Sequence, residues 1–592
     1  MKERRITKIQ RKEKVMIGID FGTSGTAFSY AFINEDKNDI LIPEEIKSPT
    51  EIILDSNMKC IAFGKNCRQV LNSEKMLKQK YYHFSDIKMK LYKNERRIQA
   101  NNDSSFHDLQ TVISQILIAI KKEALKIINS KRESPIIESN IEWKLTVPAI
   151  WREKSKELMI KAAKTAGIFN ELVTDKSLFL ALEPECAALD FINEKSSDKN
   201  VVEIGNNYIV CDIGGGTIDI STHTRKINFI DNKVYIEELY PPSGGNNGSN
   251  YINKAFMEKV IKKIFGEKAF NKLIEAVKNK TLNQDEDEDI GYDDYMHLLD
   301  QIEDFKIGIN ANSINDSKRI NCTIFKKFIK EDIDELIYKY NSICPEKWKI
   351  ENYKGLKINF PNQIMIDLTK KIIVDNTVNY IWEIIDHVKS INSIIYAGTV
   401  SKNSYIISMI QSQLPNNINS CVTIHPSLAV ARGAVMFGMN PFAIKSRISR
   451  FYIGIQISEK WNEIKHFKRQ DLKFFCPIEK CYKCQNIFSP IILKNQNVLV
   501  DEWRAKKYSL IDSKCDIVFL RTDNDNTIFT DDKLKKCQIF GTIIFDAGNE
   551  FDINDKDLLV ELKLGGTFLD AKIKYKDVEK STPVFFNNNY DL

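Results

Sequence analysis

The sequence contains no apolar run of the about 20 residues that a membrane-spanning helix needs. Its first residues also lack the apolar core of a secretory signal peptide, so we expect a cytoplasmic protein. The net charge is only +6 over 592 residues, and a balance this close to neutral does not indicate nucleic acid as a partner. We therefore expect no membrane span and no nucleic-acid complex, and the composition leaves the oligomeric state open.

The twelve cysteines lack the tight, regular spacing of a secreted disulfide framework. Only Cys476, Cys481 and Cys484 are clustered. A zinc site would need a fourth ligand, and the chain offers only His466 upstream and Cys515 well beyond the cluster. We therefore expect free or buried thiols and no structural zinc.

Two kinds of hydrophobic pattern divide the chain. Over residues 15–438, apolar strands alternate with amphipathic helices, which is typical of α/β layering. From about Phe451 onward, two-residue alternation replaces the helical period. Residues 560–564 and 569–575, for example, predict a half-buried hairpin around Gly565-Gly566.

These patterns predict the domain boundaries. Residues 15–440 are expected to form the α/β part and residues 451–580 a β-rich C-terminal domain, with residues 441–450 as the linker. Residues 1–14 are a basic tail that we expect to be disordered, and residues 581–592 are expected to be a second tail.

A glycine-rich motif occurs twice in the α/β part. Residues 16–33 and residues 208–221 each contain a strand that ends in an aspartate, a tight turn of Gly, Thr and Ser, and a second strand. The strand-ending aspartates are Asp20 and Asp212. Two ordinary hairpin turns are the alternative, but the repeat with Asp in the same place favours a shared function.

The chemistry of these turns indicates phosphate binding. Glycine lets the backbone approach a ligand, and consecutive N–H groups form a concave anion site to which hydroxyl groups add donors. Carboxylates do not bind phosphate directly, so Asp20 and Asp212 suit a hydrated Mg²⁺. The motif is not a P-loop, because no G-x-x-x-x-G-K-[ST] occurs. The predicted phosphate ligands are Gly22, Thr23 and Ser24 in the first turn and Gly214, Gly215, Gly216 and Thr217 in the second.

Both motifs resemble the phosphate motifs of the superfamily that contains actin, sugar kinases and 70-kDa heat-shock proteins. Further segments follow the order of the heat-shock family. They are residues 145–151 (connecting segment), 182–188 (similar to Asn-Glu-Pro-Thr-Ala-Ala), 303–306 (Glu-x-x-Lys around the adenosine), 395–398 (adenosine motif) and 426–434 (closing helix). The resemblance implies an α/β fold with a two-lobed, actin-like ATPase domain, a duplicated mixed sheet with flanking helices, followed by the β-rich C-terminal domain.

Other details resemble the heat shock 70 kDa protein 12 branch of that family. They are residues 240–245 with Gly248-Ser249, Pro441 followed by residues 447–450, and the segment from Cys484 to Phe488. The resemblance covers residues 15–575. It implies ATP and Mg²⁺ as cofactors, a chaperone-like role in the stress response, and a client polypeptide or protein as partner.

Glu183 is the predicted position for the residue that orients or deprotonates the attacking water. Pro184 keeps Glu183 out of helical conformation and itself suits a helix start, so the carboxylate is expected at a strand-to-helix corner. The resemblance gives it the role at the γ-phosphate. A helix-start carboxylate that only interacts with the helix dipole is the alternative.

A cation on the γ-phosphate is the second catalytic requirement. The resemblance points to Lys88, with Lys90 as its competitor and solvated helix lysines as the alternative. Thr217 and Asp212 complete the predicted catalytic set.

The adenosine end of the site is predicted from the resemblance alone. Glu303 and Lys306 share one side of a helix, although an ordinary surface ion pair has the same spacing. Gly248 and Gly398 are the further predicted nucleotide contacts. Ala397 replaces the first glycine of the family's adenosine motif, and Ser401 and Asn403 depart from its downstream pattern, so we expect a base-and-ribose end that differs from the family's.

Three functions remain open at this stage. The first is slow, Mg²⁺-dependent ATP hydrolysis coupled to client binding, and the second is an ATP-binding interaction module with little or no hydrolysis. A small-molecule kinase is the third, but no segment supplies its catalytic Asp. The basic join between the domains and the absence of helical periodicity after Asp577 depart from the family's acidic linker and helical lid.

Overall fold

The computed structural model describes residues 14–33, 40–41, 47–71, 80–170, 176–193, 202–228, 234–279, 292–500, 502–531, 537–564 and 569–583. The predicted tails, apart from Lys14 and residues 581–583, and the predicted Gly565-Gly566 turn lie outside these residues. Within the described part, no helix is long and apolar enough to cross a membrane.

Two mixed sheets share one strand plan. In the first, the order is β11-β10-β1-β2-β3, with β4 paired to β2. The bounds are β1 (Lys14–Phe21), β2 (Gly25–Ile33), β3 (Ile40–Leu41), β4 (Ser48–Pro49), β10 (Ile141–Val147) and β11 (Leu180–Leu182). Strand β1 runs antiparallel to β2 and parallel to β10, which is parallel to β11. Seven of the eight residues of β1 are buried because both faces of this strand are covered.

The second sheet repeats this plan and extends it, in the order β19-β18-β12-β13-β14-β20-β24. Strand β12 pairs antiparallel with β13 and parallel with β18, which in turn pairs parallel with β19. The bounds are β12 (Asn207–Ile213), β13 (Ile218–Ile227), β14 (Val234–Gly245), β18 (Ile391–Ala397), β19 (Asn419–Val422), β20 (Ile444–Ile448) and β24 (Asn497–Leu499).

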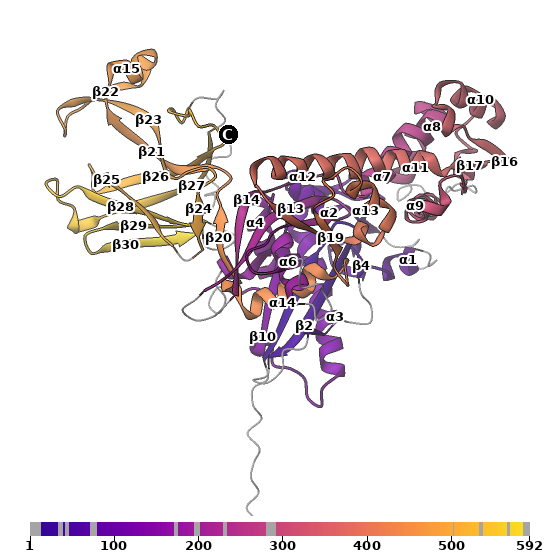
Figure 1. The fold of residues 1–592 in the computed structure, drawn as a ribbon, viewed down its shortest axis with the longest axis horizontal. Helices are drawn as coiled ribbons and strands as arrows, with labels where there is room; N and C mark the ends of the chain where they lie inside the picture. The colour runs from indigo at the N-terminus through magenta and orange to yellow at the C-terminus, as the bar shows by residue number, and fades with distance from the viewer. Residues whose placement is uncertain are drawn as a thin grey trace, which may run out of the picture.

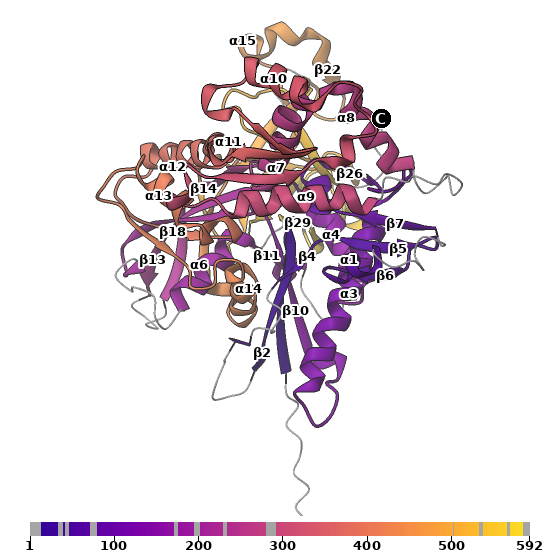
Figure 2. The same cartoon turned by 90° about the vertical axis from the view of Figure 1, so that its right-hand side faces the viewer.

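Helices cover both sheets (Figure 1 and Figure 2). Helices α3 and α4 pack on the first sheet, and α8, α9, α11 and α12 contribute to the core of the second. Helices α6 and α14 contact each other and touch both sheets, α14 at β1 and β10 and α6 at β12 and β18. The bounds are α3 (Leu109–Ser130), α4 (Glu153–Thr165), α6 (Glu183–Asn193), α8 (Lys262–Asn279), α9 (Tyr292–Ile307), α11 (Asn362–Thr369), α12 (Asp375–His387) and α14 (Ala429–Met439).

Smaller elements surround this α/β part. The short sheets are β5 (Ile52–Asp55) with β6 (Cys60–Phe63) and β7 (Tyr81–Phe84), β8 (Arg97–Gln99) with β9 (Phe106–Asp108), and β15 (Ser317–Asn321) with β16 (Glu351–Lys354) and β17 (Lys357–Pro361). The remaining larger helices are α1 (Asn66–Leu71), α2 (Ile87–Tyr92), α7 (Asn250–Phe256), α10 (Ile333–Ile343) and α13 (Ser404–Gln411).

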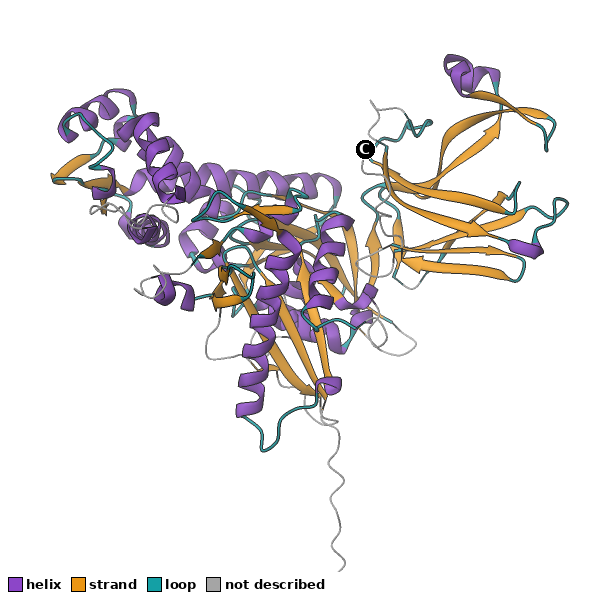
Figure 3. Ribbon diagram, turned by 180° about the vertical axis from the view of Figure 1, so that it is seen from behind, coloured by secondary structure: helices purple, strands orange, loops and turns teal. Residues whose placement is uncertain are grey.

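The C-terminal strands form two antiparallel sheets on a separate apolar core (Figure 3). One has the order β22-β23-β21-β26-β27 and the other β25-β28-β29-β30. The bounds are β21 (Tyr452–Lys460), β22 (Lys473–Cys476), β23 (Cys481–Ile492), β25 (Arg504–Ser509), β26 (Lys514–Thr522), β27 (Gln538–Asp546), β28 (Asp557–Lys563), β29 (Asp570–Tyr575) and β30 (Val578–Pro583).

The mixed α/β structure predicted from the sequence is confirmed. The hairpin predicted over residues 560–575 is also confirmed, because β28 pairs antiparallel with β29 and Val560 faces Ile573. Part of the predicted linker, residues 441–450, is a strand. This strand, β20, pairs with β14 and β24 in the second sheet. The side chains of Ile444 and Ser446 are buried there.

The contact between α6 and α14 predicts a specific sensitivity to substitution. A Cβ atom added at Gly433 of α14 would lie 1.8 Å from the backbone oxygen of Cys186 in α6, which cannot move aside. At Gly438 of the same helix, the nearest atom is the flexible Met16 sulfur at 2.3 Å. We expect Gly433→Ala to lower the free energy of unfolding by about 1–3 kcal/mol and Gly438→Ala by less. Equal denaturant midpoints for the two variants would contradict this packing.

Candidate functional site

The two glycine motifs form hairpins whose turns touch. In the first, Asp20 at the end of β1 faces Ala27, and in the second, Asp212 at the end of β12 faces Asp219. A Cβ atom added at Gly215 would lie 1.7 Å from the Ser24 hydroxyl oxygen. Only glycine therefore allows the second turn to approach the first this closely.

The next residue, Gly216, also lies very close to the first turn. A Cβ atom at Gly216 would lie 2.2 Å from the Thr23 hydroxyl oxygen, and Ser24 donates a hydrogen bond of 2.8 Å to Asn250 of α7. The Gly22 carbonyl accepts a hydrogen bond of 2.6 Å from the Thr50 hydroxyl. The first turn is therefore held from behind while its tip faces the second turn.

A cavity of about 30 Å³ lies between the turns. This volume is far below the about 300–1,000 Å³ of pockets that hold small organic ligands. The predicted site residues that line the cavity are Asp20, Gly22, Thr23, Ser24, Lys88, Glu183, Asp212, Gly214, Gly215, Gly216, Thr217 and Gly398. The structure thus brings together residues from five separate stretches of the chain.

Lys88 and Glu183 form a buried ion pair. Their side chains are only 4% and 5% exposed, and Lys88 Nζ donates to Glu183 Oε1 over 2.6 Å. Lys88 comes from α2, and Glu183 lies at the predicted corner where β11 ends. The expectation that Pro184 keeps Glu183 out of the helix is wrong, because α6 begins at Glu183 itself. Burial opposes the charge of Lys88, but Glu183 and Asp20 outweigh it and raise the pKa of the ammonium group. Lys88 therefore stays protonated.

Carboxylates outnumber cations at this site. Burial raises the pKa of Asp212 to about 7, and the charges of Asp20 and Asp219 add to the effect. Burial also raises the pKa of Glu183, which Lys88 only partly offsets while the three aspartates raise it further. Lys47 is the second cation, and its Nζ lies 3.1 Å from Asp20 Oδ2. Four carboxyl groups thus face two ammonium groups.

This arrangement fits a magnesium–phosphate group. A divalent cation would neutralise the excess negative charge of the carboxylates. The glycines of the turns leave space for an anion that the side chain of another residue would fill. Among the described residues, the Thr23 hydroxyl has only the Met89 sulfur as acceptor, at 3.8 Å, which is a weak partner. One buried carboxylate oxygen of Asp219 has no hydrogen-bond partner in the described part of the chain.

Gly248 packs against the second hairpin, and Gly398 packs beside Asp212. The Gly248 amide donates to the Gly216 carbonyl over 3.1 Å, so Gly248 lies behind the turn and does not line the cavity. Gly398 has a φ of +85°, and a Cβ atom there would lie 2.4 Å from Asp212 Oδ1. Glycine at 398 thus lets the adenosine-motif segment pass directly beside the carboxylate.

Glu303 and Lys306 are not among the residues that line the cavity. They pair with each other over 2.6 Å on α9, and Lys306 also reaches the Ser249 carbonyl at 3.4 Å. Lys90 pairs with Glu95 over 2.9 Å, whereas Lys88 faces the cavity. Of the two competing lysines, only Lys88 therefore lies at the glycine turns.

Sequence reasoning missed several residues of the site. Lys47, Thr399 and Ser427 line the cavity, and Asp219 lies next to it. Asp219 was visible as part of the second motif, where its alternation with Ile218 and Ile220 indicated nothing more than a strand. Lys47 had no such signal, because it belongs to no motif and reaches Asp20 only through the fold.

Cys476 lies on β22, and Cys481 and Cys484 lie on β23. No group of three or more His, Cys, Asp or Glu side chains in the described part of the chain is arranged to hold a metal ion directly. Cys476 faces Cys481 across β22 and β23, and burial raises the pKa of the Cys484 thiol. All three are free thiols.

Comparison with known proteins identifies distant relatives over nearly the whole chain, although no family model matches. Heat shock 70 kDa protein 12A of Mus musculus is 23% identical, over 96% of this chain and 91% of the relative. Heat shock 70 kDa protein 12B of Homo sapiens is 21% identical, over 84% of this chain and 79% of the relative. A chaperone protein HscA homolog of Rickettsia prowazekii is 26% identical, over 36% of this chain and 33% of the relative. The resemblance to the heat shock 70 kDa protein 12 branch is confirmed.

The buried ion pair predicts a pH-dependent loss of stability. Lys88→Met leaves Glu183 buried without its counter-charge, which costs about 3–5 kcal/mol. Because the pKa of Glu183 is then still further above its ordinary value of 4.5, the folded variant binds a proton that the unfolded chain releases. Its stability should therefore fall as the pH rises above about 4.5, measured by denaturant unfolding.

Two further variants separate this effect from simple loss of packing. Lys88→Met with Glu183→Gln should recover part of the stability and abolish the added pH dependence. Lys90→Met on the same helix removes only a half-buried pair at the surface and should change stability less than Lys88→Met does. A Lys88→Met variant with the wild-type pH profile would contradict the pairing.

Proposed function

We propose that this chain binds ATP with Mg²⁺ between its two glycine hairpins and hydrolyses the nucleotide slowly. The observation that carries this proposal is the facing pair of Asp-ended turns. The residues of both turns line one cavity, and the carboxyl groups around it exceed the ammonium groups. A magnesium–triphosphate complex combines the anion and the dication that such a site would take.

Each residue has a role that follows from its chemistry. Bound Mg²⁺ supplies positive charge that neutralises the phosphate oxygens. Asp20 and Asp212 hold its water shell by accepting hydrogen bonds, and the hydroxyls of Thr23 and Thr217 donate to phosphate oxygens. Lys88 balances the charge that develops on the γ-phosphate.

Glu183 orients the attacking water and accepts its proton. Its carboxylate already has an oxygen bound to Lys88, so the direction in which it faces is restrained. Glu303, Lys306 and Gly398 are proposed to contact the base and ribose, with Gly248 supporting the second turn. When a nucleotide binds there, contacts with the ligand partly replace the ion pair between Glu303 and Lys306.

The domain scheme belongs to the same proposal. The two mixed sheets correspond to two lobes within residues 15–440, and residues 451–580 are a β-rich domain for a client polypeptide. Because the turns touch, a triphosphate enters only when the hairpins separate. The resulting lobe movement reaches the C-terminal sheets through β20, which joins the second sheet immediately before β21.

A binding module with little hydrolysis is the second candidate. It is favoured by the ion pair of 2.6 Å between Lys88 and Glu183, because each group is held by the other rather than by substrate. In that case nucleotide binding alone would shift the lobes. The two candidates differ only in whether Glu183 takes part in bond cleavage.

Single-turnover hydrolysis of labelled ATP separates the two candidates. We expect Glu183→Gln to slow the chemical step by about 100-fold or more, while the dissociation constant for ATP changes little. Glu142→Gln on β10, an exposed carboxylate, is the matched control and should keep the wild-type rate. Equal rates for wild type and Glu183→Gln would exclude the hydrolytic role and leave the binding module.

The metal role of Asp212 predicts a second outcome. By calorimetry, wild type should bind ATP more tightly with Mg²⁺ than with a chelator. In Asp212→Asn this advantage should fall by about 10- to 100-fold, as for other residues that hold a metal through its water. The exposed Asp316→Asn is the control. Retention of the full Mg²⁺ effect in Asp212→Asn would show that the cation is held elsewhere.

A further inference from the structure

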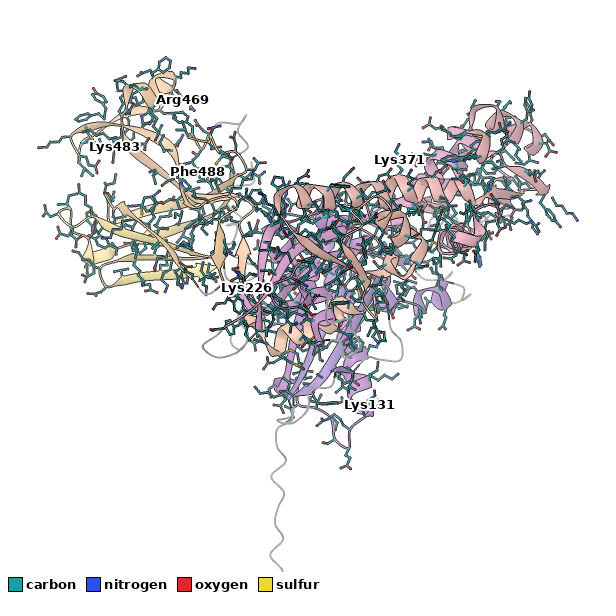
Figure 4. All side chains as sticks on the ribbon, viewed as in Figure 1. Lys131, Lys226, Lys371, Arg469, Lys483 and Phe488 are labelled. Carbon is teal, nitrogen blue, oxygen red and sulfur yellow. The ribbon has the colours of Figure 1, made fainter. Side chains whose placement is uncertain are left out.

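A second cavity, of about 510 Å³, lies where the α/β part meets the C-terminal sheets. Its walls come from the start of α4, from β14, from the segment that joins β20 to β21, and from β26 and β27. Figure 4 labels Lys226 in β13 and Phe488 in β23, which mark the two parts on either side of this junction. The volume falls in the range of pockets that hold small organic ligands, about 300–1,000 Å³.

Basic side chains dominate this junction cavity. Its charged lining residues are Arg152, Lys156, Arg447, Arg450 and Arg521 on the basic side and Glu153, Glu238 and Asp523 on the acidic side. Glu238 contributes little negative charge near neutral pH, because burial raises its pKa to about 8. The cavity therefore carries more positive than negative charge.

Two of the arginines are engaged by carboxylates. Arg447 forms a bidentate pair with Glu185, with distances of 2.7 and 2.8 Å. Arg521 of β26 pairs with Glu153 of α4 over 2.6 Å, which ties the C-terminal sheet to the α/β part. Even so, the buried Nε of Arg521 has no hydrogen-bond partner in the described part of the protein.

Arg450 is the half-buried cation of the lining that has no partner in the described part of the chain. Among the described residues, its guanidinium group makes no hydrogen bond or ion pair, and its nearest aromatic contact is the Phe451 ring, 5.8 Å away. Crowding of positive charge is also visible at Lys156, where burial and the neighbouring Arg447, Arg521 and Arg450 lower the pKa to about 8. A partly exposed guanidinium facing a cavity with surplus positive charge is a binding site for an anion.

The apolar part of the lining indicates the rest of the ligand. Trp151, Phe451 and Phe540 contribute aromatic surface around the basic groups. The Arg521 guanidinium already stacks on Phe451 with a separation of 4.7 Å, so flat groups fit this wall. An inorganic ion alone would leave most of the cavity unfilled.

We propose that the junction cavity binds a small organic anion whose phosphate or carboxylate head pairs with Arg450 and whose flat apolar body packs on the aromatic wall. Such a ligand touches residues of both the α/β part and the C-terminal sheets. It therefore reinforces the junction that the Glu153–Arg521 pair holds. None of the residues that line this cavity also lines the cavity between the glycine hairpins.

Titration calorimetry on the full chain tests this site with phenyl phosphate and benzoate as probes, in buffer free of phosphate and sulfate. We expect saturable binding of at least one probe, weakened about tenfold or more in Arg450→Gln because a charged hydrogen-bond donor is lost. Stronger binding of phenyl phosphate assigns a phosphate head, and stronger binding of benzoate assigns a carboxylate head.

Two further variants serve as controls for the loss of binding in Arg450→Gln. Arg450→Lys keeps the charge without the forked donors and should bind at intermediate strength. Arg319→Gln removes an arginine that stacks on Tyr353 outside the cavity, at 3.3 Å from the ring centre, and should bind as wild type. Absence of saturable binding for both probes overturns the proposal, and so does wild-type affinity in both Arg450 variants.

Discussion

The structure of the proposed nucleotide site depends on one electrostatic constraint, the crowding of four carboxyl groups around two lysines. Asp20, Asp212, Asp219 and Glu183 share a region of low exposure with Lys47 and Lys88. Burial makes this surplus of negative charge costly, so the site favours whatever brings positive charge or protons. A divalent cation with a polyphosphate satisfies that demand and at the same time uses the donors of both turns.

The carboxyl groups can meet only because the backbones of the elements around them pack very closely on one another. Helix α14 lies directly on β1, where a Cβ atom at Gly18 would be 2.5 Å from the Ala431 carbonyl oxygen, and it lies as closely on α6 at Gly433. Helices α6 and α14 thus set the separation of the two sheets, and the sheets set the separation of the turns. Glycines at the turns then allow contact between Gly215 and Ser24.

Much of this site could be predicted from the sequence, because the repeated turns carry local signals. The strand ends at Asp20 and Asp212 and the corner at Glu183 follow from short patterns of glycine, aspartate and proline. Lys47 could not be predicted, since it reaches the site through tertiary packing alone. The tertiary environment also distinguishes Lys88 from Lys90, which the sequence spacing left open.

The fold, like the site, could be predicted only in part from the sequence. The alternation of apolar residues indicated the α/β part and the hairpin of β28 and β29, but the incorporation of residues 444–448 into the second sheet depends on their distant partner β14. The sequence showed only one part of the junction cavity, the basic join that contains Arg447 and Arg450. Its basic residues come from α4, from the segment after β20 and from β26, and only the folded chain brings them together.

The most direct measurement is a crystal structure of the protein with Mg²⁺ and a non-hydrolysable ATP analogue. The triphosphate is expected between residues 22–24 and 214–217, with the metal's water molecules bonded to Asp20 and Asp212. A nucleotide bound elsewhere, with the two turns still in contact, would contradict the central claim that these hairpins hold the phosphates.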